Sequence, residues 1–390
     1  MNLYFPKGFL WGASTSAHQV EGNNQNDWSV WEKVNAQRLA SLNKNRKIKF
    51  PQARDPQNYI SGRAADHYNR FSDDFQIASS MGHNAHRFSI EWSRIEPQEG
   101  VFDQREIDHY RKVISSLKEK NMKPLVTLWH WTLPIWLKEK GGLLNPEFPN
   151  YFSRYTQRMA DEYHDLVSFW MTLNEPTSVI SNAYIKGFWP PQKRNPIKAL
   201  IASKNLAQAH KSAYKVIKER DLNASVGVGH IMTMFCGVLS SLNIFNRTFL
   251  SLCGPENQDY ISLQYYFSKG FRAQKFSDMG WPLHPEGIYP LLMKLKKYKK
   301  PIYITENGLA DADDLHRRWY IEETLKSVMS AIKEGVDVRG YFHWSLIDNF
   351  EWDKGFWPRF GLVEIDYKTL DRKPRPSSDY YSKICKNNHL

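Results

Sequence analysis

Short apolar runs alternate with amphipathic segments along most of the chain, and the runs are rich in β-branched and aromatic residues. Such runs are typical of strands buried on both faces, as in a parallel sheet. The segments between them repeat apolar residues at helical spacing, so the pattern predicts strands that alternate with helices. The eight expected strands are 9–15, 84–90, 123–131, 167–174, 225–232, 259–266, 301–307 and 338–347.

The helical spacing is clearest between residues 103 and 121, where Asp103 and Glu106 also have the spacing of a capping box. Its apolar stripe consists of Ile107, Tyr110, Ile114 and Leu117. Eight strands in βα alternation predict a closed barrel, whereas a doubly wound sheet would normally show a glycine-rich turn after its first strand. Residues 9–19 contain no GxGxxG motif. We therefore expect the α/β class and one (β/α)8 TIM barrel domain over residues 1–390.

The chain is basic, with a formal net charge of +12. Clustered Lys and Arg attract nucleic acid, but the densest clusters here, 42–50 and 294–300, are short. Solvated loop and helix faces explain them better than a binding arm does. We expect no nucleic-acid partner.

The three cysteines, Cys236, Cys253 and Cys385, form no CxxC pair, which argues against a disulfide framework or a zinc site. The first twelve residues lack the basic start and apolar core of a signal peptide, and no uncharged stretch is long enough to span a bilayer. These features predict a cytoplasmic protein with no membrane partner.

Two glutamates follow apolar runs and stand beside an asparagine: Glu175 in TLNEP and Glu306 in ITENG. The ends of four other expected strands carry Arg87, His130, Tyr266 and Trp344. Any one of these residues could cap a helix or be a satisfied core residue. Six at the carboxyl ends of barrel strands indicate a common pocket, because those ends meet at one rim.

Two carboxylates in a pocket with indoles and amides suit cleavage of a glycosidic bond. Indole faces pack on the C–H side of a sugar ring, and carboxylates and amides take its hydroxyls. A divalent metal site would need several clustered carboxylates or a HExxH-type spacing, which the rim does not offer. We expect a small carbohydrate as ligand and neither a metal nor an organic cofactor.

The chain resembles glycoside hydrolase family 1, the retaining β-glycosidases, from its first expected strand to near its C-terminus. Several long motifs carry this resemblance together, which excludes a chance match. They are FLWGASTSAHQVEG, DHYNRFSDD, RFSIEWSRIEP, TLWHWTLPIWL, TLNEP, GWPLHPEGIY, ITENG, HWSLIDNFEW and RFGLVEID.

The resemblance implies that Glu175 is the general acid/base and Glu306 the nucleophile, with their carboxyl groups about 5 Å apart as retaining chemistry requires. It further implies that Arg87 and Tyr266 hold Glu306 ionised and oriented, and that Asn174 donates to the sugar 2-hydroxyl.

Other matched positions resemble the lining of the sugar subsite. They are Gln19, His130, Trp131, Glu351 and Trp352, with Trp344 as its floor and Phe360 as an apolar wall that core packing explains nearly as well. Glu351 suits the free 4- and 6-hydroxyls of the sugar and would repel a 6-phosphate. Trp281 is the expected aromatic platform for the leaving group.

Three features depart from the family pattern. Gln264, which we expect to bind substrate, stands where relatives commonly have Asn, so its longer side chain is expected to shift Tyr266 or reshape the substrate-binding cleft. Thr177 replaces a common Trp on the leaving-group side. The chain is also shorter than many members, which predicts trimmed loops around the rim.

The sequence therefore predicts a retaining β-glycosidase that hydrolyses terminal non-reducing β-D-glucosides, and β-galactosides or β-fucosides secondarily, through a covalent glycosyl-enzyme intermediate. Three alternatives stay open at this point. They are a transglycosylase, a 6-phospho-β-glycosidase on the same scaffold and a non-catalytic sugar-binding barrel.

Overall fold

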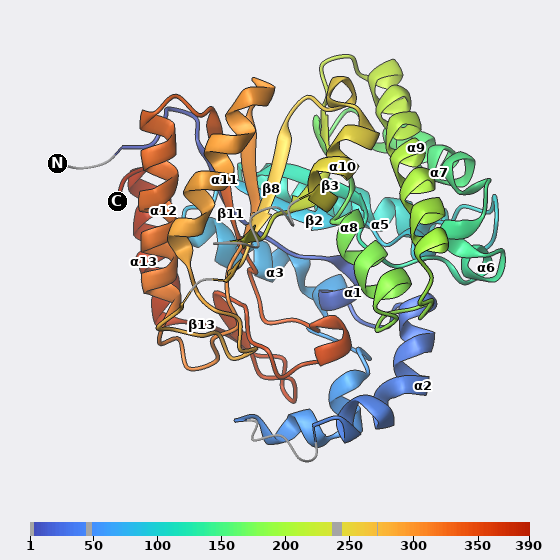
Figure 1. The fold of residues 1–390 in the computed structure, drawn as a ribbon, viewed down its shortest axis with the longest axis horizontal. Coiled ribbons are helices and arrows are strands. Elements are labelled where there is room, and N and C mark those ends of the chain that lie inside the picture. Colours follow the sequence, from blue (N-terminus) through green and yellow to red (C-terminus); the bar gives the residue numbers. More distant parts are fainter. Residues whose placement is uncertain (1–3, 44–48, 236–243, 271) are drawn as a thin grey trace.

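A closed ring of parallel strands forms the centre of the molecule in the computed structural model, which describes residues 4–43, 49–235, 244–270 and 272–390 (Figure 1). The strand order is β5-β4-β3-β2-β1-β11-β10-β8-β6. Only Val228 separates β5 from β6, and these segments pair with β4 and β8 respectively, so together they are the fifth strand and close the ring. The strands are β1 (Leu10–Ser14), β2 (Ala85–Ser89), β3 (Lys123–Trp129), β4 (Phe169–Leu173), β5 (Ser225–Gly227), β6 (Gly229–Ile231), β8 (Ile261–Tyr265), β10 (Ile302–Asn307) and β11 (Val338–Trp344).

Helices follow the strands in sequence and surround the ring (Figure 1). The larger ones are α2 (Asp27–Ser41), α3 (His67–Ser80), α5 (Gln104–Glu119), α7 (Phe148–Tyr163), α9 (Pro196–Arg220), α10 (Ile244–Cys253), α11 (Ile288–Leu295), α12 (Arg317–Lys333) and α13 (Pro376–Asn387). The shorter ones are α1 (Ala17–Val20), α4 (Trp92–Ile95), α6 (Ile135–Glu139), α8 (Pro176–Val179) and a π-helical turn, η4 (Ile180–Ile185). The predicted α/β class and (β/α)8 barrel are confirmed.

Short 3₁₀ turns and two small strand pairs complete the connections. The 3₁₀ turns are η1 (Pro51–Arg54), η2 (Pro56–Tyr59), η3 (Gly142–Leu144), η6 (Pro255–Asn257), η7 (Pro285–Gly287), η8 (Lys296–Tyr298) and η9 (Trp352–Lys354). The small pairs are β7 (Met234–Phe235) with β9 (Ser268–Lys269), and β12 (Val363–Ile365) with β13 (Arg372–Pro374).

Helix α5 shows how one predicted helix formed and where its expected cap failed. The four residues of the predicted stripe are all buried, and the Asp103 side chain accepts a hydrogen bond from the Arg105 backbone N–H. The reciprocal half of the capping box is wrong, because Glu106 instead accepts from the Tyr68 hydroxyl at 3.1 Å and faces Arg94. The Glu106 carboxylate therefore makes a tertiary contact in place of the local capping contact.

A small apolar cluster fills the ring near the amino-terminal ends of its strands. It consists of Ala85, Leu125, Phe169, Met171, Tyr260 and Phe342, all buried. Phe169 packs edge-on against Tyr260 with ring centroids 4.7 Å apart. Because this half of the barrel is packed with side chains, a pocket can open only toward the carboxyl ends of the strands.

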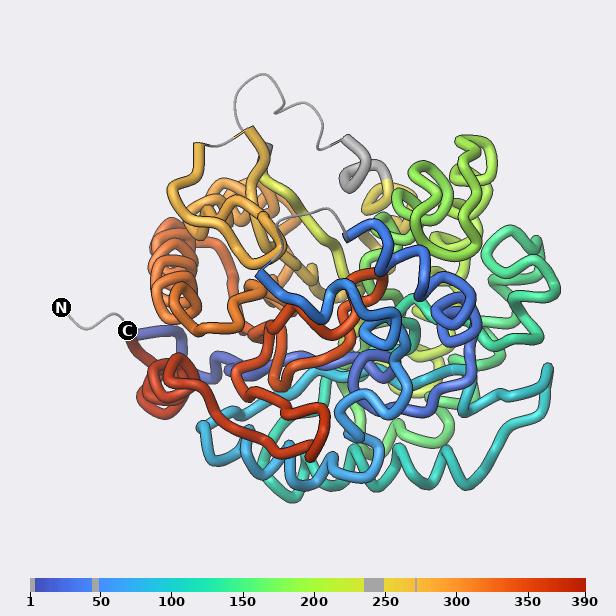
Figure 2. Tube along the Cα trace, turned by 90° about the horizontal axis from the view of Figure 1, so that it is seen from below, coloured from blue at the N-terminus to red at the C-terminus, as the bar shows by residue number. Residues whose placement is uncertain are grey.

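The two ends of the described chain lie side by side (Figures 1 and 2). The Phe5 backbone N–H donates to the Asn388 carbonyl at 3.0 Å, and Tyr4 bridges His389. The first and last barrel connections also meet, since the Asn58 side chain donates to the Lys354 carbonyl at 2.9 Å. This second contact joins the connection after β1 to the loop after β11.

Other sequence predictions concern the surface and the cysteines. Lys294, Lys296 and Lys297 are exposed around the end of α11, as expected for a solvated helix face. Most of the other basic cluster lies outside the described residues, as does Cys236, while Cys253 and Cys385 are buried free thiols. None of the helices in the described ranges is both long and apolar enough to cross a bilayer.

Candidate active site

A cavity of about 650 Å³ opens at the carboxyl ends of the barrel strands. This volume lies in the usual range for small-ligand sites. Eleven of the predicted site residues line it: Gln19, His130, Trp131, Glu175, Tyr266, Trp281, Glu306, Trp344, Glu351, Trp352 and Phe360. The other three, Arg87, Asn174 and Gln264, are fully buried and lie against lining residues. The predicted convergence on one pocket therefore holds, with three residues behind its surface.

Glu306 is held at both carboxylate oxygens at the end of β10. Its Oε1 accepts from the Arg87 guanidinium and from Gln264 Nε2 at 2.9 Å, and its Oε2 accepts from the Tyr266 hydroxyl at 2.6 Å. These donors come from β2 and from the end of β8, so the ring of strands places them. A carboxylate with this many donors, one of them cationic, is oriented and stabilised as an anion.

A set of hydrogen-bonded residues at and directly behind the pocket surface forms what we call the floor network: Arg87, Asn174, Gln264, Tyr266 and Glu306. Arg87 Nη2 and Gln264 Nε2 both donate to Asn174 Oδ1 at 2.7 Å, and Arg87 Nε donates to Thr127 at 3.0 Å. Gln264 thus differs from its expected role as a substrate-binding residue, because it contacts Glu306 rather than the pocket. Tyr266 keeps its bond to Glu306, so the longer amide has not displaced it.

Glu175 lies at the end of β4, where the backbone changes direction into α8. Its φ of 38° lies in the left-handed region, which is uncommon for a residue other than glycine. The Glu175 N–H donates to the Gly229 carbonyl at 3.0 Å, and the Ser178 hydroxyl donates to its Oε2 at 2.7 Å. Trp131 and Trp352 also have positive φ, so three pocket residues share a conformation that only the surrounding fold can impose.

The two carboxyl groups have different electrostatic surroundings. Burial raises the pKa of Glu175 well above its usual value, and the charge of Glu306 raises it further. Burial also raises the pKa of Glu306, but the Arg87 charge and the Tyr266 hydrogen bond oppose that shift. Glu306 therefore ionises first, and its charge keeps the proton on Glu175.

Aromatic rings form one wall of the pocket. Trp131 packs against Trp189 and Trp352 at centroid distances of 4.7 and 4.6 Å, and its Nε1 donates to the Asn174 carbonyl at 2.9 Å. His130 stacks on Trp352 and on Trp344, each with centroids 6.0 Å apart. The wall offers flat apolar faces whose orientation is fixed by mutual packing.

A third carboxyl group, that of Glu351, lies half-buried in the wall beside Gln19. Gln19 Nε2 donates to Asn349 Oδ1 and the Phe350 carbonyl at 2.9 Å and lies 3.3 Å from Glu351 Oε2. Burial, with the nearby charges of Asp353 and Glu306, raises the pKa of Glu351 to about 8. Hydroxyl groups that donate to this carboxylate would favour its ionised form.

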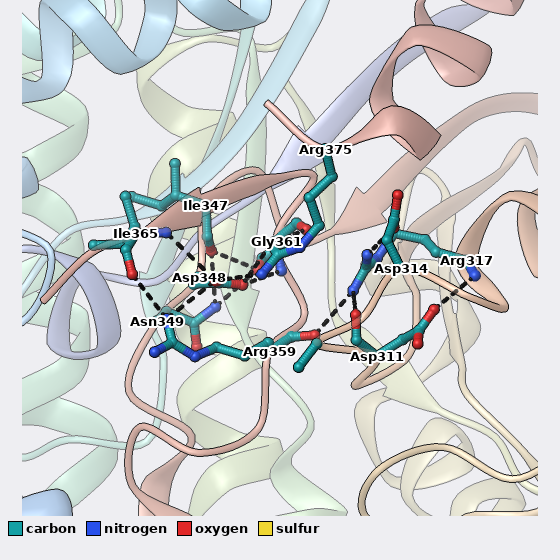
Figure 3. A network of polar contacts seen from close by, with 12 residues as sticks. Asp311, Asp314, Arg317, Ile347, Asp348, Asn349, Arg359, Gly361, Ile365 and Arg375 are labelled. Atoms are coloured by element: carbon teal, nitrogen blue, oxygen red, sulfur yellow. Dashed lines mark hydrogen bonds and ion pairs between the residues drawn. The ribbon is translucent and has the colours of Figure 1, made fainter. Parts of the chain in front are cut away.

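The loop after β11, which carries Glu351 and Trp352, is anchored by Asp348 (Figure 3). This fully buried carboxylate accepts from both Arg375 Nη atoms at 3.0 and 2.9 Å and from Arg359 at 3.2 Å. It also accepts from the Gly361 backbone N–H at 2.9 Å. The sequence contained the DNFEW motif, but the anchoring role of its aspartate depends on arginines that only the fold brings near.

Several pocket residues were missed by sequence reasoning. They include Ser178, Ser181, Asn182, Lys186, Phe188, Trp189, Lys269 and Asp353. Ser178 could have been found from its spacing, since it lies one helical turn after Glu175. The others lie in η4, β9, η9 and the loops beside them, where the sequence shows no distinctive pattern. In the described ranges, no three His, Cys, Asp or Glu residues gather as metal ligands.

A (β/α)8 barrel whose pocket combines two buried carboxyl groups with indole walls has the features of a glycosidase. The family model "Glycosyl hydrolase family 1" matches residues 1–241 and 253–390. Beta-glucosidase A of Thermotoga maritima is 32% identical over 457 aligned positions, covering 99% of this chain and 98% of the relative. Beta-glucosidase A of Acetivibrio thermocellus is 31% identical, with 99% of each chain covered.

Solved structures give the same result. A beta-glycosidase from Pyrococcus horikoshii matches with a TM-score of 0.90 and 35% identity, covering 100% of this chain and 96% of that one. The Thermotoga maritima beta-glucosidase in complex with castanospermine matches with a TM-score of 0.87 and 31% identity, covering 100% and 99%. The chain belongs to glycosyl hydrolase family 1, which confirms the predicted class of enzyme, a glycoside hydrolase.

The alignment with the Thermotoga maritima relative is longer than the 390 residues of this chain. That relative therefore carries segments which this chain lacks, in line with the expected shortening.

Proposed function

We propose that the protein is a retaining β-glycosidase that hydrolyses terminal non-reducing β-D-glucosides by double displacement. The observation that carries the proposal is the asymmetry of the two pocket carboxyl groups: Glu306 accepts from three donors, one of them Arg87, whereas Glu175 accepts from the neutral Ser178. Two carboxyl groups held in different protonation states suit a nucleophile and a general acid.

In the first step, the Glu306 carboxylate attacks the anomeric carbon while the bond from that carbon to the leaving oxygen breaks. The proton of Glu175 moves to the leaving oxygen. A covalent glycosyl ester on Glu306 and a free alcohol or phenol result. Arg87 and Tyr266 hold the nucleophile in position, so little reorganisation is needed as its charge disappears.

In the second step, water attacks the anomeric carbon and the ester bond to Glu306 breaks. Glu175 now acts as base and takes the proton from water, because the charge that held its own proton has gone. Sugar and free enzyme are released with the original protonation restored.

Sugar recognition in this proposal comes from the aromatic wall and from Gln19 with Glu351. Glucosides are favoured as substrates because the curated relatives include enzymes named beta-glucosidase, and β-galactosides are proposed as secondary substrates because others are named beta-galactosidase. β-Fucosides stay a prediction. Contact between Asn174 and the 2-hydroxyl also stays a prediction, since the Asn174 amide is fully buried and lies 3.0 Å from His130 Nε2.

Two broader features are part of the proposal. Residues 1–390 act as one catalytic domain, which the continuous barrel supports. The protein works in the cytoplasm, an expectation that rests on the sequence features described above.

The experiment measures phenol release from a panel of aryl β-glycosides: glucoside, galactoside, fucoside, mannoside, xyloside and glucoside 6-phosphate. Glu306→Ala should lower kcat by about 10⁴- to 10⁶-fold, and azide should restore turnover of an activated aryl glucoside with α-glycosyl azide as product. Glu175→Ala with azide should give the β-anomer, because the nucleophile is intact there. Azide rescue also shows that each variant is folded.

Other results would support the alternatives. Activity confined to the 6-phosphate would favour a phospho-glycosidase, and alkyl glycosides as the main products in the presence of added alcohol would favour a transglycosylase. No turnover of any panel member by the wild type would contradict the proposal and favour a sugar-binding protein.

A further inference from the structure

Three lysines line the outer part of the pocket, and we call this part the mouth. Lys186 follows η4, Lys269 ends β9 and Lys354 ends η9, and Asp353 is the acidic residue beside them. The inference drawn from them rests on the proposed function, since it concerns the leaving group of the same reaction.

The lysines differ in what surrounds them. Lys354 is paired with Asp353 at 2.6 Å, and Asp353 also accepts from Trp189 Nε1 at 3.0 Å, so both oxygens of this carboxylate have a donor. Lys186 donates to the neutral Asn182 side chain at 3.2 Å. Its pKa is lowered by partial burial and then by the positive charge of Lys269. Asp353 opposes this pKa shift and Lys354 adds to it. Lys186 and Lys269 both line the mouth.

Their position relative to the carboxyl groups indicates what they face. A single segment runs from Glu175 through α8 and η4 to Lys186, and its Ser178, Ser181 and Asn182 line the pocket. The general acid stands where the leaving oxygen departs, so the side chains that continue outward from it face the leaving group. Lys354 instead belongs with Glu351, whose pKa its charge lowers, on the side assigned to the sugar.

The leaving-group side also carries apolar surface. Trp281 packs against Phe267 with ring centroids 5.0 Å apart, Met279 lines the same side, and Phe188 is 53% exposed. A ligand that suits this surface has a flat apolar part beside the glycosidic oxygen and a negative charge farther out. An anion that lies between two positively charged side chains is attracted by both of them.

We propose that the mouth selects β-glycosides whose leaving group carries an anionic group, held by Lys186 and Lys269. The simplest alternative is that these lysines are solvated surface charges of a basic protein, with no effect on substrate choice. The two explanations differ in whether a charge on the leaving group changes kcat/KM.

The test compares 4-(carboxymethyl)phenyl β-glucoside with the corresponding uncharged carboxamide. The methylene group separates the charge from the phenol oxygen, so the two leaving groups have similar intrinsic reactivity. The measured quantity is the ratio of kcat/KM for the carboxylate to that for the amide. It is measured at low and high salt in the wild type, in Lys186→Gln, in Lys269→Gln and in the double variant, with Lys186→Arg as a charge-preserving variant.

Lys118→Gln is the matched control. It removes the same charge from an exposed residue in the last turn of α5, just before β3 begins and so at the opposite end of the barrel. We expect a wild-type ratio of about 3 to 10 at low salt, which the double variant or high salt brings close to 1. Lys186→Arg and Lys118→Gln should keep the wild-type ratio.

A wild-type ratio near 1, or a preference that survives in the double variant, overturns the inference while turnover of the amide leaves the proposed function standing. An equal fall in Lys118→Gln also overturns it, because net charge would then be the cause. Absence of turnover of both substrates overturns the proposed function and this inference with it.

Discussion

The floor network and the mouth of the same pocket hold their charges in opposite ways. In the floor network, Arg87 and Glu306 are buried and bonded to each other, and the surrounding donors lie within 2.6 to 3.0 Å of their acceptors. At the mouth, Lys186 and Lys269 are exposed, and partial burial and then the charge of Lys269 lower the pKa of Lys186. Both regions are lined by polar groups, but only one of them is shielded from water.

This difference decides how strongly each region can act. Charges in a buried site interact through a low effective dielectric and are hardly screened by salt, whereas charges at the mouth are weakened by water and ions. The floor network is therefore expected to control the chemical step, and the mouth to adjust the choice of leaving group. Variants in the floor network should therefore leave the carboxylate-to-amide ratio of kcat/KM unchanged. Variants at the mouth should leave the pH profile of kcat/KM unchanged.

The largest effect is expected at Arg87. Arg87→Met removes the cation that opposes the raised pKa of Glu306, so a smaller fraction of Glu306 is ionised at a given pH. We expect kcat/KM to fall by about 10²- to 10³-fold and the acid limb of its pH profile to move to higher pH. The measurement is kcat/KM for an aryl glucoside from acidic to alkaline pH.

Arg87→Lys is the companion variant, because Arg87→Met leaves a buried carboxylate unpaired and is expected to cost about 3 to 5 kcal/mol of stability. The lysine keeps the charge but not the second bond to Asn174, so its acid limb should lie between those of the wild type and Arg87→Met. An acid limb that stays in place in both variants would contradict the role given to Arg87.

An intermediate effect is expected at Glu351, which lies in the pocket wall beside Gln19. Glu351→Gln replaces a carboxyl group, which sugar hydroxyls favour in its ionised and strongly accepting form, by a neutral amide. We therefore expect kcat/KM for the glucoside to fall about 10- to 100-fold. In the wild type, binding of an uncharged glucose-like inhibitor should release protons near pH 7, since the pKa of Glu351 is about 8 without ligand. Calorimetry in buffers of different ionisation enthalpy measures this release, which should be absent in Glu351→Gln.

The same pKa has a consequence for stability. The folded-state pKa of Glu351 is raised from 4.5 to about 8, so the protonated group favours the folded state. Its contribution is fully present below pH 4.5 and is lost as the pH rises toward 8. Tm of Glu351→Gln should therefore fall less steeply across this window than Tm of the wild type. Parallel Tm curves would show that Glu351 is not buried enough to titrate in this way.

The smallest effect is expected at Gln264. Gln264→Asn shortens the side chain by one methylene group. This change draws the amide nitrogen away from Glu306 and Asn174, but it also moves the amide oxygen, for which the described residues supply no donor, out of its present position. These changes oppose each other, so we expect kcat to fall by about threefold to tenfold with little change in KM. Because Arg87 and Tyr266 remain, a loss as large as that of Arg87→Met would show that Gln264 is the main support of Glu306.

Particular residues show how far sequence reasoning reached. Glu175 and Glu306 could be singled out because each follows an apolar run at a strand end, and barrel geometry brings such ends together. Gln264 was recognised as unusual, but the sequence could not predict where its side chain points. A rotation about one side-chain bond decides whether the amide lies in the pocket or behind it. The capping box of Asp103 and Glu106 failed because Tyr68, far away in sequence, competes for the glutamate.

The sequence by itself determined the alternation of strands and helices, the closed barrel and the set of residues at its rim, because hydrophobic periodicity and strand ends are local properties. Only the tertiary structure decided which of those residues touch. Arg87 bonded to Glu306, Asp348 bonded to Arg375, and Lys186 and Lys269 in one pocket lining all join segments that are separated along the chain. Their distances, burial and pKa shifts depend on how the whole ring packs, and no local pattern contains that information.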